Sequence, residues 1–186
     1  MVLCLCLFQR ALRLVGHLER WLGVGLMAIM VGAITTQVFT RYVFSRPIIW
    51  VEELATYSFI WGVFVGASLG LKYGRHIKIE TFVDHLPPRA KAASRILINL
   101  IVIAVLWHLL REVGKVIDIE GRSTSVSLPW PVARAWFYSI PLAASCLSML
   151  ATCAYLLLVD IAMLAGAKGV DTTGIMGLQR PANVQV

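Results

Sequence analysis

The feature that most constrains this chain is a run of eighteen residues without a charged side chain, from Leu54 to Leu71. A helix needs about 20 mostly apolar residues to cross a bilayer, so the run predicts a membrane span. Trp50, Glu52 and Glu53 precede it, and Lys72 closes it. The whole chain agrees with this interpretation. It is 59% hydrophobic over 186 residues, against the ~45–50% that is usual for soluble domains.

The central run also carries small residues at four-residue spacing: Ser58, Gly62, Gly66 and Gly70. Each glycine costs about 1 kcal/mol in a soluble helix, whereas in lipid small residues allow helix backbones to approach closely. We therefore predict that this stripe packs against another helix, either within the chain or in a partner subunit. Bulky residues are expected on the opposite side: Phe59, Trp61 and Phe64.

Three further apolar runs complete an all-α integral membrane fold. The four predicted spans are 22–39, 54–71, 96–110 and 136–159, within one membrane domain over 1–165. The third helix continues past the bilayer and is expected to end near Gly121, with Glu112 and Lys115 paired on its surface. Pro141 is expected in the first turns of the last span, which Asp160 ends.

The segments outside the spans are polar or amphipathic. Apolar residues at helical spacing over 1–21 and the basic stretch 75–95 predict interfacial segments on the membrane surface. The Gly- and Ala-rich tail, 166–186, is expected to be disordered.

The net charge of +7 does not indicate nucleic-acid binding, because the basic residues fall between the apolar runs. Eleven of the 17 Lys and Arg residues lie on the side that holds both termini, and six lie on the other side. The positive-inside rule therefore predicts that both termini are cytoplasmic and that Glu52 and Glu53 are outside.

No chemistry-bearing constellation is evident in the sequence. None of the four spans contains Asp, Glu, Lys or Arg, whereas an ion-coupled transporter that works alone needs ionisable groups near the midplane. Of the four histidines, only His108 lies within a span, and a lone histidine is more often a packed side chain than a haem ligand. We therefore predict no catalytic, substrate-binding or metal-binding residues, no cofactor and no enzyme activity.

Several short motifs resemble the small, DctQ-like membrane subunit of tripartite ATP-independent periplasmic (TRAP) transporters. The resemblance covers roughly residues 10 to 160, in the family's order and four-span layout. It rests on the following runs: Arg41-Tyr42-Val43-Phe44, Trp50-Val51-Glu52-Glu53-Leu54, Trp61, Phe64, Gly66-Ala67, Gly74-x-His76-Ile77, Leu86-Pro87, Leu128-Pro129-Trp130, Tyr138 and Pro141.

This resemblance implies a scaffold subunit of a sodium-coupled transporter in a bacterial inner membrane. Its expected partners are a large permease subunit, which carries an organic-acid-type solute, and a periplasmic solute-binding protein. The subunit itself is expected to bind no substrate.

Ten residues are candidates for partner contacts. Carboxylates at the start of a helix are stabilised by the positive end of the helix dipole, so one of the two glutamates needs no other role. We expect the other to face Arg41 or a basic residue of a partner. Trp50 is as readily explained as an aromatic-belt anchor, and Arg111, Lys115 and Arg122 as solvated charges. The candidates for the subunit interface are Arg41, Trp50, Glu52, Glu53, Gly62, Gly66 and Gly70, and those for docking an acidic binding protein are Arg111, Lys115 and Arg122.

A membrane anchor of a redox enzyme is the alternative function. A haem anchor would show a Soret absorption band, which distinguishes the two hypotheses. The residues that select a solute would lie in other subunits, so the sequence does not name the solute.

Overall fold

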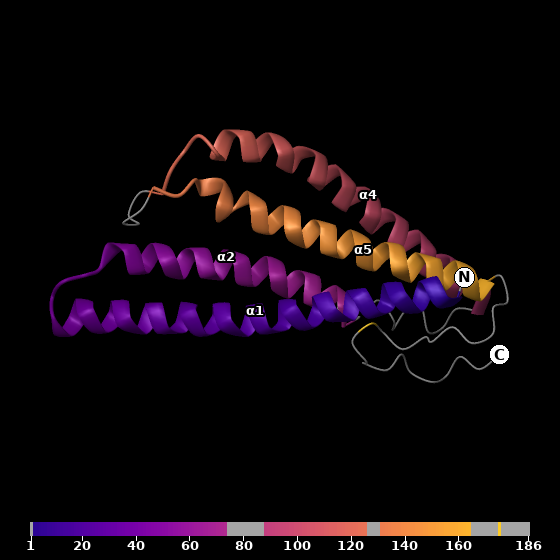
Figure 1. Cartoon of the computed structure of the whole chain (residues 1–186), viewed down its shortest axis with the longest axis horizontal. Helices are drawn as coiled ribbons and strands as arrows, with labels where there is room; N and C mark the ends of the chain where they lie inside the picture. The colour runs from indigo at the N-terminus through magenta and orange to yellow at the C-terminus, as the bar shows by residue number, and fades with distance from the viewer. Residues whose placement is uncertain (1, 74–87, 126–130, 165–174, 176–186) are drawn as a thin grey trace. The chain divides into compact units, whose positions relative to one another are not determined.

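A computed structural model describes residues 2–73, 88–125, 131–164 and 175. It contains four long helices, which Figure 1 labels: α1 (Val2–Val43), α2 (Ile49–Lys72), α4 (Pro88–Glu120) and α5 (Ser139–Leu164). A short 3-10 helix, η1 (Arg134–Trp136), precedes α5. The described ranges contain no β-strand, only an isolated bridge between Thr124 and Ala133. The all-α prediction is therefore confirmed.

All four long helices contain stretches that are long and apolar enough to cross a membrane. A helix satisfies its backbone N–H and C=O groups within itself, which the interior of a bilayer requires. Hydroxyls inside these stretches do the same: Thr35 donates to the carbonyl of Val31, and Thr36 to that of Gly32. The predicted number of spans is therefore confirmed.

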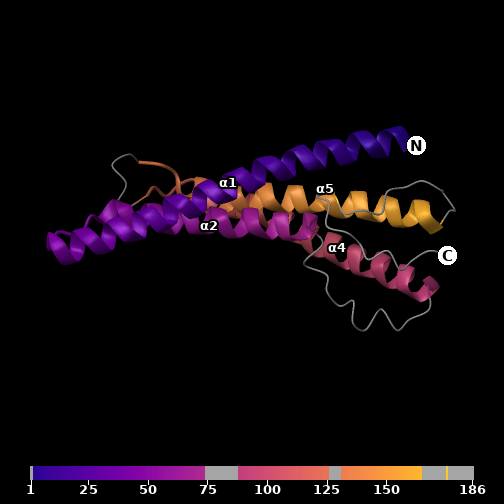
Figure 2. The ribbon, with the colours of Figure 1, turned by 90° about the horizontal axis from the view of Figure 1, so that it is seen from below.

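The helices are longer than the predicted spans. Figure 2 shows α1 as a single uninterrupted helix, where the sequence predicted an interfacial segment followed by a separate span. Its 42 residues correspond to about 63 Å, roughly twice the hydrocarbon thickness of a bilayer. The apolar residues at helical spacing before Leu22 thus continue the helix of the first span. Whether they also lie on a membrane surface stays a prediction.

The other helix ends follow from local chemistry. Pro88 begins α4, a position where its missing N–H costs nothing. The predicted end near Gly121 is confirmed, and a Cβ at Gly121 would lie 2.9 Å from the carbonyl oxygen of Ile117. Pro141 lies in the first turn of α5 as predicted. Asp160 does not end α5, however, because the apolar residues after it extend the helix to Leu164.

The chain divides into two compact units. One comprises Leu18–Ala67 and Leu110–Ser145. In this unit α1 and α2 form an antiparallel hairpin, in which Ala33 packs with Val51 and Ala55, and a Cβ on Gly23 would lie 3.7 Å from Val65. Ser45 turns the chain between the two helices with a φ of 51°, a left-handed conformation that costs a non-glycine residue about 1–2 kcal/mol.

The other unit comprises Met1–His17, Ser68–Leu109 and Cys146–Val186. Its apolar core joins the start of α1 to the end of α5, where Leu12 packs with Tyr155, Val159 and Ile175. The Nε of Arg13 also donates a hydrogen bond to the carbonyl of Ile175. The predicted interfacial stretch after Tyr73 and the predicted disordered tail lie outside the described residues, apart from the start of α4 and Ile175.

Candidate partner-binding surface on α2

One face of α2 packs tightly against the segment that leads into α5. The ring of Tyr57 stacks on that of Phe137 with centroids 3.8 Å apart and an angle of 5° between the planes. Tyr138 meets the same ring edge-on at 5.8 Å. One turn further along α2, the indole nitrogen of Trp61 donates a hydrogen bond to the carbonyl of Trp136. Aromatic pairs of this kind add about 0.5–1.5 kcal/mol beyond the area that they bury.

The last turn of α2 is tied to α5 by a buried cation. The Nζ of Lys72 lies 2.6 Å from the hydroxyl oxygen of Ser148 and 3.4 Å from that of Ser68. Only 2% of Lys72 is exposed. A charge taken out of water needs acceptors around it, so these hydroxyls help to make its burial tolerable.

The other face of α2 is largely exposed within the described residues. Glu52, Phe59 and Gly66, at seven-residue intervals, are exposed, and so is Val63 between the last two. A Cβ added to Gly62 or Gly66 would meet nothing within 4 Å. We call Glu52, Phe59, Gly62, Val63 and Gly66 the open face of α2.

The small-residue stripe is therefore covered at one end and exposed at Gly66 within the part of the chain that the structure describes. Four residues turn a helix by 400°, so a stripe at this spacing rotates by about 40° at each step. Ser58 is buried, Gly62 and Gly70 are half-buried, and Gly66 is exposed. A Cβ at Gly66 would meet no described residue, so the predicted close contact of Gly66 with another helix stays a prediction.

One bulky residue of α2 is not where it was predicted. Phe59 shares a face with Gly66, because seven residues make almost two whole turns. Trp61 bonds Trp136 on the packed face. The prediction was wrong for Phe59 because it ignored the rotation of the stripe around the helix. The helix period keeps Trp61 and Phe64 on the side away from the stripe, as predicted.

The two glutamates have different surroundings, as their separation of about 100° on the helix suggests. Glu53 accepts a hydrogen bond from the hydroxyl of Tyr57, while Glu52 is exposed. Within the described residues, no ion pair joins Arg41 to either carboxylate. A contact of Glu52 with a partner's basic residue stays a prediction, as does the role of Trp50, which is 44% exposed.

The predicted docking residues lie on or just after the last turns of α4. Arg111 and Arg122 are exposed, whereas Lys115 pairs with Glu112 at 2.9 Å, the helix-surface pair that the spacing predicted. The charge of Lys115 is thus partly balanced, and the two arginines carry most of the positive potential of this group.

Sequence reasoning missed the contacts of Tyr57 and Lys72. The only signal for the first is Glu53 four residues before Tyr57, a spacing that brings side chains together on a helix. Lys72 was counted with the basic residues outside the spans. A lysine is usually exposed, so the sequence did not indicate that its side chain is buried.

A family model for the DctQ component of tripartite ATP-independent periplasmic transporters matches residues 30–163. This range covers more than two thirds of the chain and all of α2. The chain belongs to the DctQ family. The match begins later than the resemblance that the motifs suggested, because residues 10–29 fall outside it.

Named relatives agree with this assignment. The chain is 33% identical over 79 residues to the sialic acid TRAP transporter small permease protein SiaQ of Vibrio cholerae, which covers 42% of this chain and 46% of SiaQ. It is 36% identical over 70 residues to the C4-dicarboxylate TRAP transporter small permease protein DctQ of the same organism, covering 36% and 30%. It is also 27% identical over 96 residues to the permease protein SiaT of Haemophilus influenzae, covering 52% of this chain and 16% of SiaT.

The chain thus spans less than half the length of SiaQ and of DctQ of Vibrio cholerae. Membership of a transporter family confirms that the chain is not an enzyme, and it removes the redox-anchor alternative. Together with the four membrane-length helices, it indicates a multi-pass protein of the bacterial inner membrane.

Proposed function

We propose that this chain is the small scaffold subunit of a sodium-coupled, binding-protein-dependent transporter for an organic-acid-type solute. The observation that carries the proposal is the family match over α2, a helix whose open face has no partner among the described residues. In this proposal, a large permease subunit packs along the open face and carries the solute.

The composition of the second span favours a scaffold role over solute binding. The run Leu54–Leu71 contains no Asp, Glu, Lys or Arg that could bind a solute or its coupling ion. The large permease is proposed as the partner by analogy with relatives. The chain also matches parts of longer permease proteins, namely SiaT and the isethionate TRAP transporter permease protein DctMQ of Oleidesulfovibrio alaskensis. A match to one section of a longer permease is what a subunit that is fused in some relatives would give.

The large subunit gains a wider frame from such a partner. A domain that moves a solute across a bilayer must move against something that stays still, and a narrow frame would move with its load. A subunit bound along α2 enlarges the frame without touching the solute. Arg111 and Arg122, with the partly balanced Lys115, then form a basic group that steers an acidic binding protein by long-range attraction.

Reconstitution tests the proposal. Proteoliposomes that hold only this chain are expected to show no sodium-driven uptake when a cognate binding protein and its solute are supplied. Adding the large subunit is expected to establish uptake, and liposomes with the large subunit alone are expected to show little. Uptake by this chain alone contradicts the scaffold role, and full uptake by the large subunit alone makes this chain dispensable.

The proposed orientation places both termini in the cytoplasm, because eleven of the 17 Lys and Arg residues lie on that side. Alkaline phosphatase fused after Val186 is expected to be inactive, and a green fluorescent protein fused there is expected to fluoresce. Active phosphatase would reverse the orientation and place Arg111 and Arg122 inside, where they cannot meet a periplasmic protein.

A further inference from the structure

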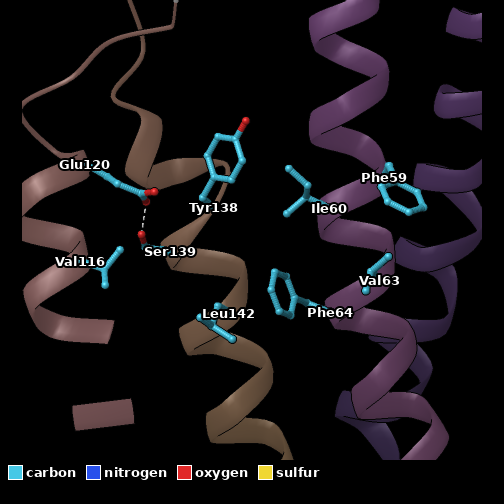
Figure 3. A pocket seen from close by; sticks show the side chains of 9 residues that line it. All are labelled: Phe59, Ile60, Val63, Phe64, Val116, Glu120, Tyr138, Ser139 and Leu142. Atoms are coloured by element: carbon cyan, nitrogen blue, oxygen red, sulfur yellow. Dashed lines mark hydrogen bonds between the residues drawn. The ribbon is translucent and has the colours of Figure 1, made fainter. Parts of the chain in front are cut away.

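An apolar pocket of about 420 Å³ lies between α2, α4 and α5. In Figure 3, Ile60 and Phe64 of α2 point across it toward Tyr138 and Leu142, and Val116 of α4 lines it from the side of that helix. Small-molecule sites usually measure about 300–1,000 Å³, and one water takes up about 30 Å³ in the liquid. The pocket is therefore too large for a single water and the right size for part of an organic molecule.

Two polar groups in the wall of the pocket bond each other and therefore need no polar ligand. The hydroxyl of Ser139 donates to the carboxylate of Glu120, as the dashed line in Figure 3 marks. The other walls are apolar apart from the hydroxyl of Tyr138. All three helices contain stretches that are long and apolar enough to cross a membrane, and the residues that line the pocket fall within those stretches. A hydrocarbon chain is apolar like the lining of the pocket, and membrane lipids supply such chains.

A positive charge contacts one residue of the pocket wall. The guanidinium carbon of Arg134 is 5.5 Å from the centroid of the Tyr138 ring, and that ring forms part of the wall. Arg134 is exposed, and Trp136, which is 57% exposed, follows two residues later. Exposed tryptophans mark the headgroup level of membrane proteins. An arginine at that level is placed to contact a lipid phosphate.

We propose that this pocket holds an acyl chain of a membrane phospholipid whose phosphate contacts Arg134. The phosphate complements the arginine, and the chain fills the space between Phe64 and Leu142 that the helices leave open. The lipid would brace the start of α5 against α2 next to the stacked rings of Tyr57 and Phe137. Phe59 and Val63 of the open face also line the pocket, so the lipid would lie next to the surface that we propose for the large permease. Lipid binding by the isolated chain does not depend on that partner.

Native mass spectrometry of the full chain tests the lipid site. The protein is extracted in mild detergent, stripped of lipid, and mixed with dioleoyl phosphatidylglycerol. Leu142→Trp fills the pocket and is expected to lower the lipid-bound fraction about tenfold, because two groups cannot share one space. Leu147→Trp is the matched control. This leucine is on the same helix, is 55% exposed and does not line the pocket, so lipid binding is expected to be unchanged.

A second variant tests the phosphate contact without altering the core. Arg134→Gln is expected to weaken phosphatidylglycerol binding about threefold, the size of a single exposed charge contact, with Arg122→Gln as its control. Dioleoylglycerol, which has the same chains and no phosphate, is expected to bind equally to the natural chain and to Arg134→Gln.

Equal lipid binding by Leu142→Trp and Leu147→Trp would overturn the proposal. If Leu142→Trp alone also failed to co-purify with the large permease, the pocket would belong to that partner. An Arg134→Gln variant that binds phosphatidylglycerol like the natural chain would remove the phosphate contact and, with it, the phospholipid.

Discussion

The two faces of α2 differ in what holds them. The packed face is fixed by stacked rings, an indole hydrogen bond and a buried lysine, which involve Tyr57, Trp61 and Lys72. The open face presents Phe59, which is 56% exposed, and Gly66, where an added Cβ would meet nothing within 4 Å. One helix can thus contribute both to the internal packing of the subunit and to the surface that we propose for its partner. Substitutions on the two faces should therefore affect different measurements.

The largest effect on stability is expected at Tyr57. Tyr57→Ala removes a ring that is 5% exposed and stacked on Phe137, and losses of buried aromatic rings cost about 3–5 kcal/mol in soluble cores. Steric-trapping or thermal unfolding of the isolated chain in detergent measures the change. Phe59→Ala, two residues away on the open face, is the matched control and is expected to cost less than about 1 kcal/mol. Similar losses for both variants would mean that the two faces are equally packed.

A smaller effect is expected where α2 ends. Ser148→Ala removes an acceptor from the Lys72 ammonium, and hydrogen bonds to charged groups contribute about 1.5–3 kcal/mol. Ser145→Ala serves as the control, because the hydroxyl of Ser145 is buried but donates to Leu142 of its own helix. The same unfolding measurement applies. A loss at Ser145 as large as that at Ser148 would show that Lys72 does not depend on α5.

The smallest effect on stability is expected at Gly66. Gly66→Leu places a side chain in open space and replaces glycine by a better helix former, a gain of up to about 0.8–1 kcal/mol in a helix interior. The isolated chain should therefore unfold at the same temperature as the natural one or slightly above it. Clear destabilisation would mean that the open face is covered within this chain.

Local patterns in the sequence predicted much of the fold. Apolar runs located the four spans, Gly121 marked the end of α4, and the three-residue spacing of Glu112 and Lys115 gave their ion pair. Each of these depends on residues that are close in the sequence. The extra length of α1 was missed because polar residues before Leu22 suggested a different environment, although they do not interrupt a helix.

The contacts that define the packed face could not be predicted in this way. Lys72 and Ser148 are 76 residues apart, and their pairing depends on how two helices pack rather than on a local motif. Tyr57 and Phe137 are likewise distant in the sequence. The open face was partly predictable, since the rotation of a four-residue stripe follows from helix geometry. Whether a partner covers this face cannot be predicted from helix geometry.

The most direct test of the account is co-purification of the large permease subunit with Gly66→Leu. Gly114→Leu on α4 is the matched control, because a Cβ there also meets nothing within 4 Å. If the large subunit packs closely along α2, Gly66→Leu lowers the amount recovered by about tenfold or more, since a leucine holds the two backbones apart. Gly114→Leu should recover the same amount as the natural chain. Full recovery with Gly66→Leu, together with normal uptake, would show that the open face of α2 meets lipid and that the large subunit binds elsewhere.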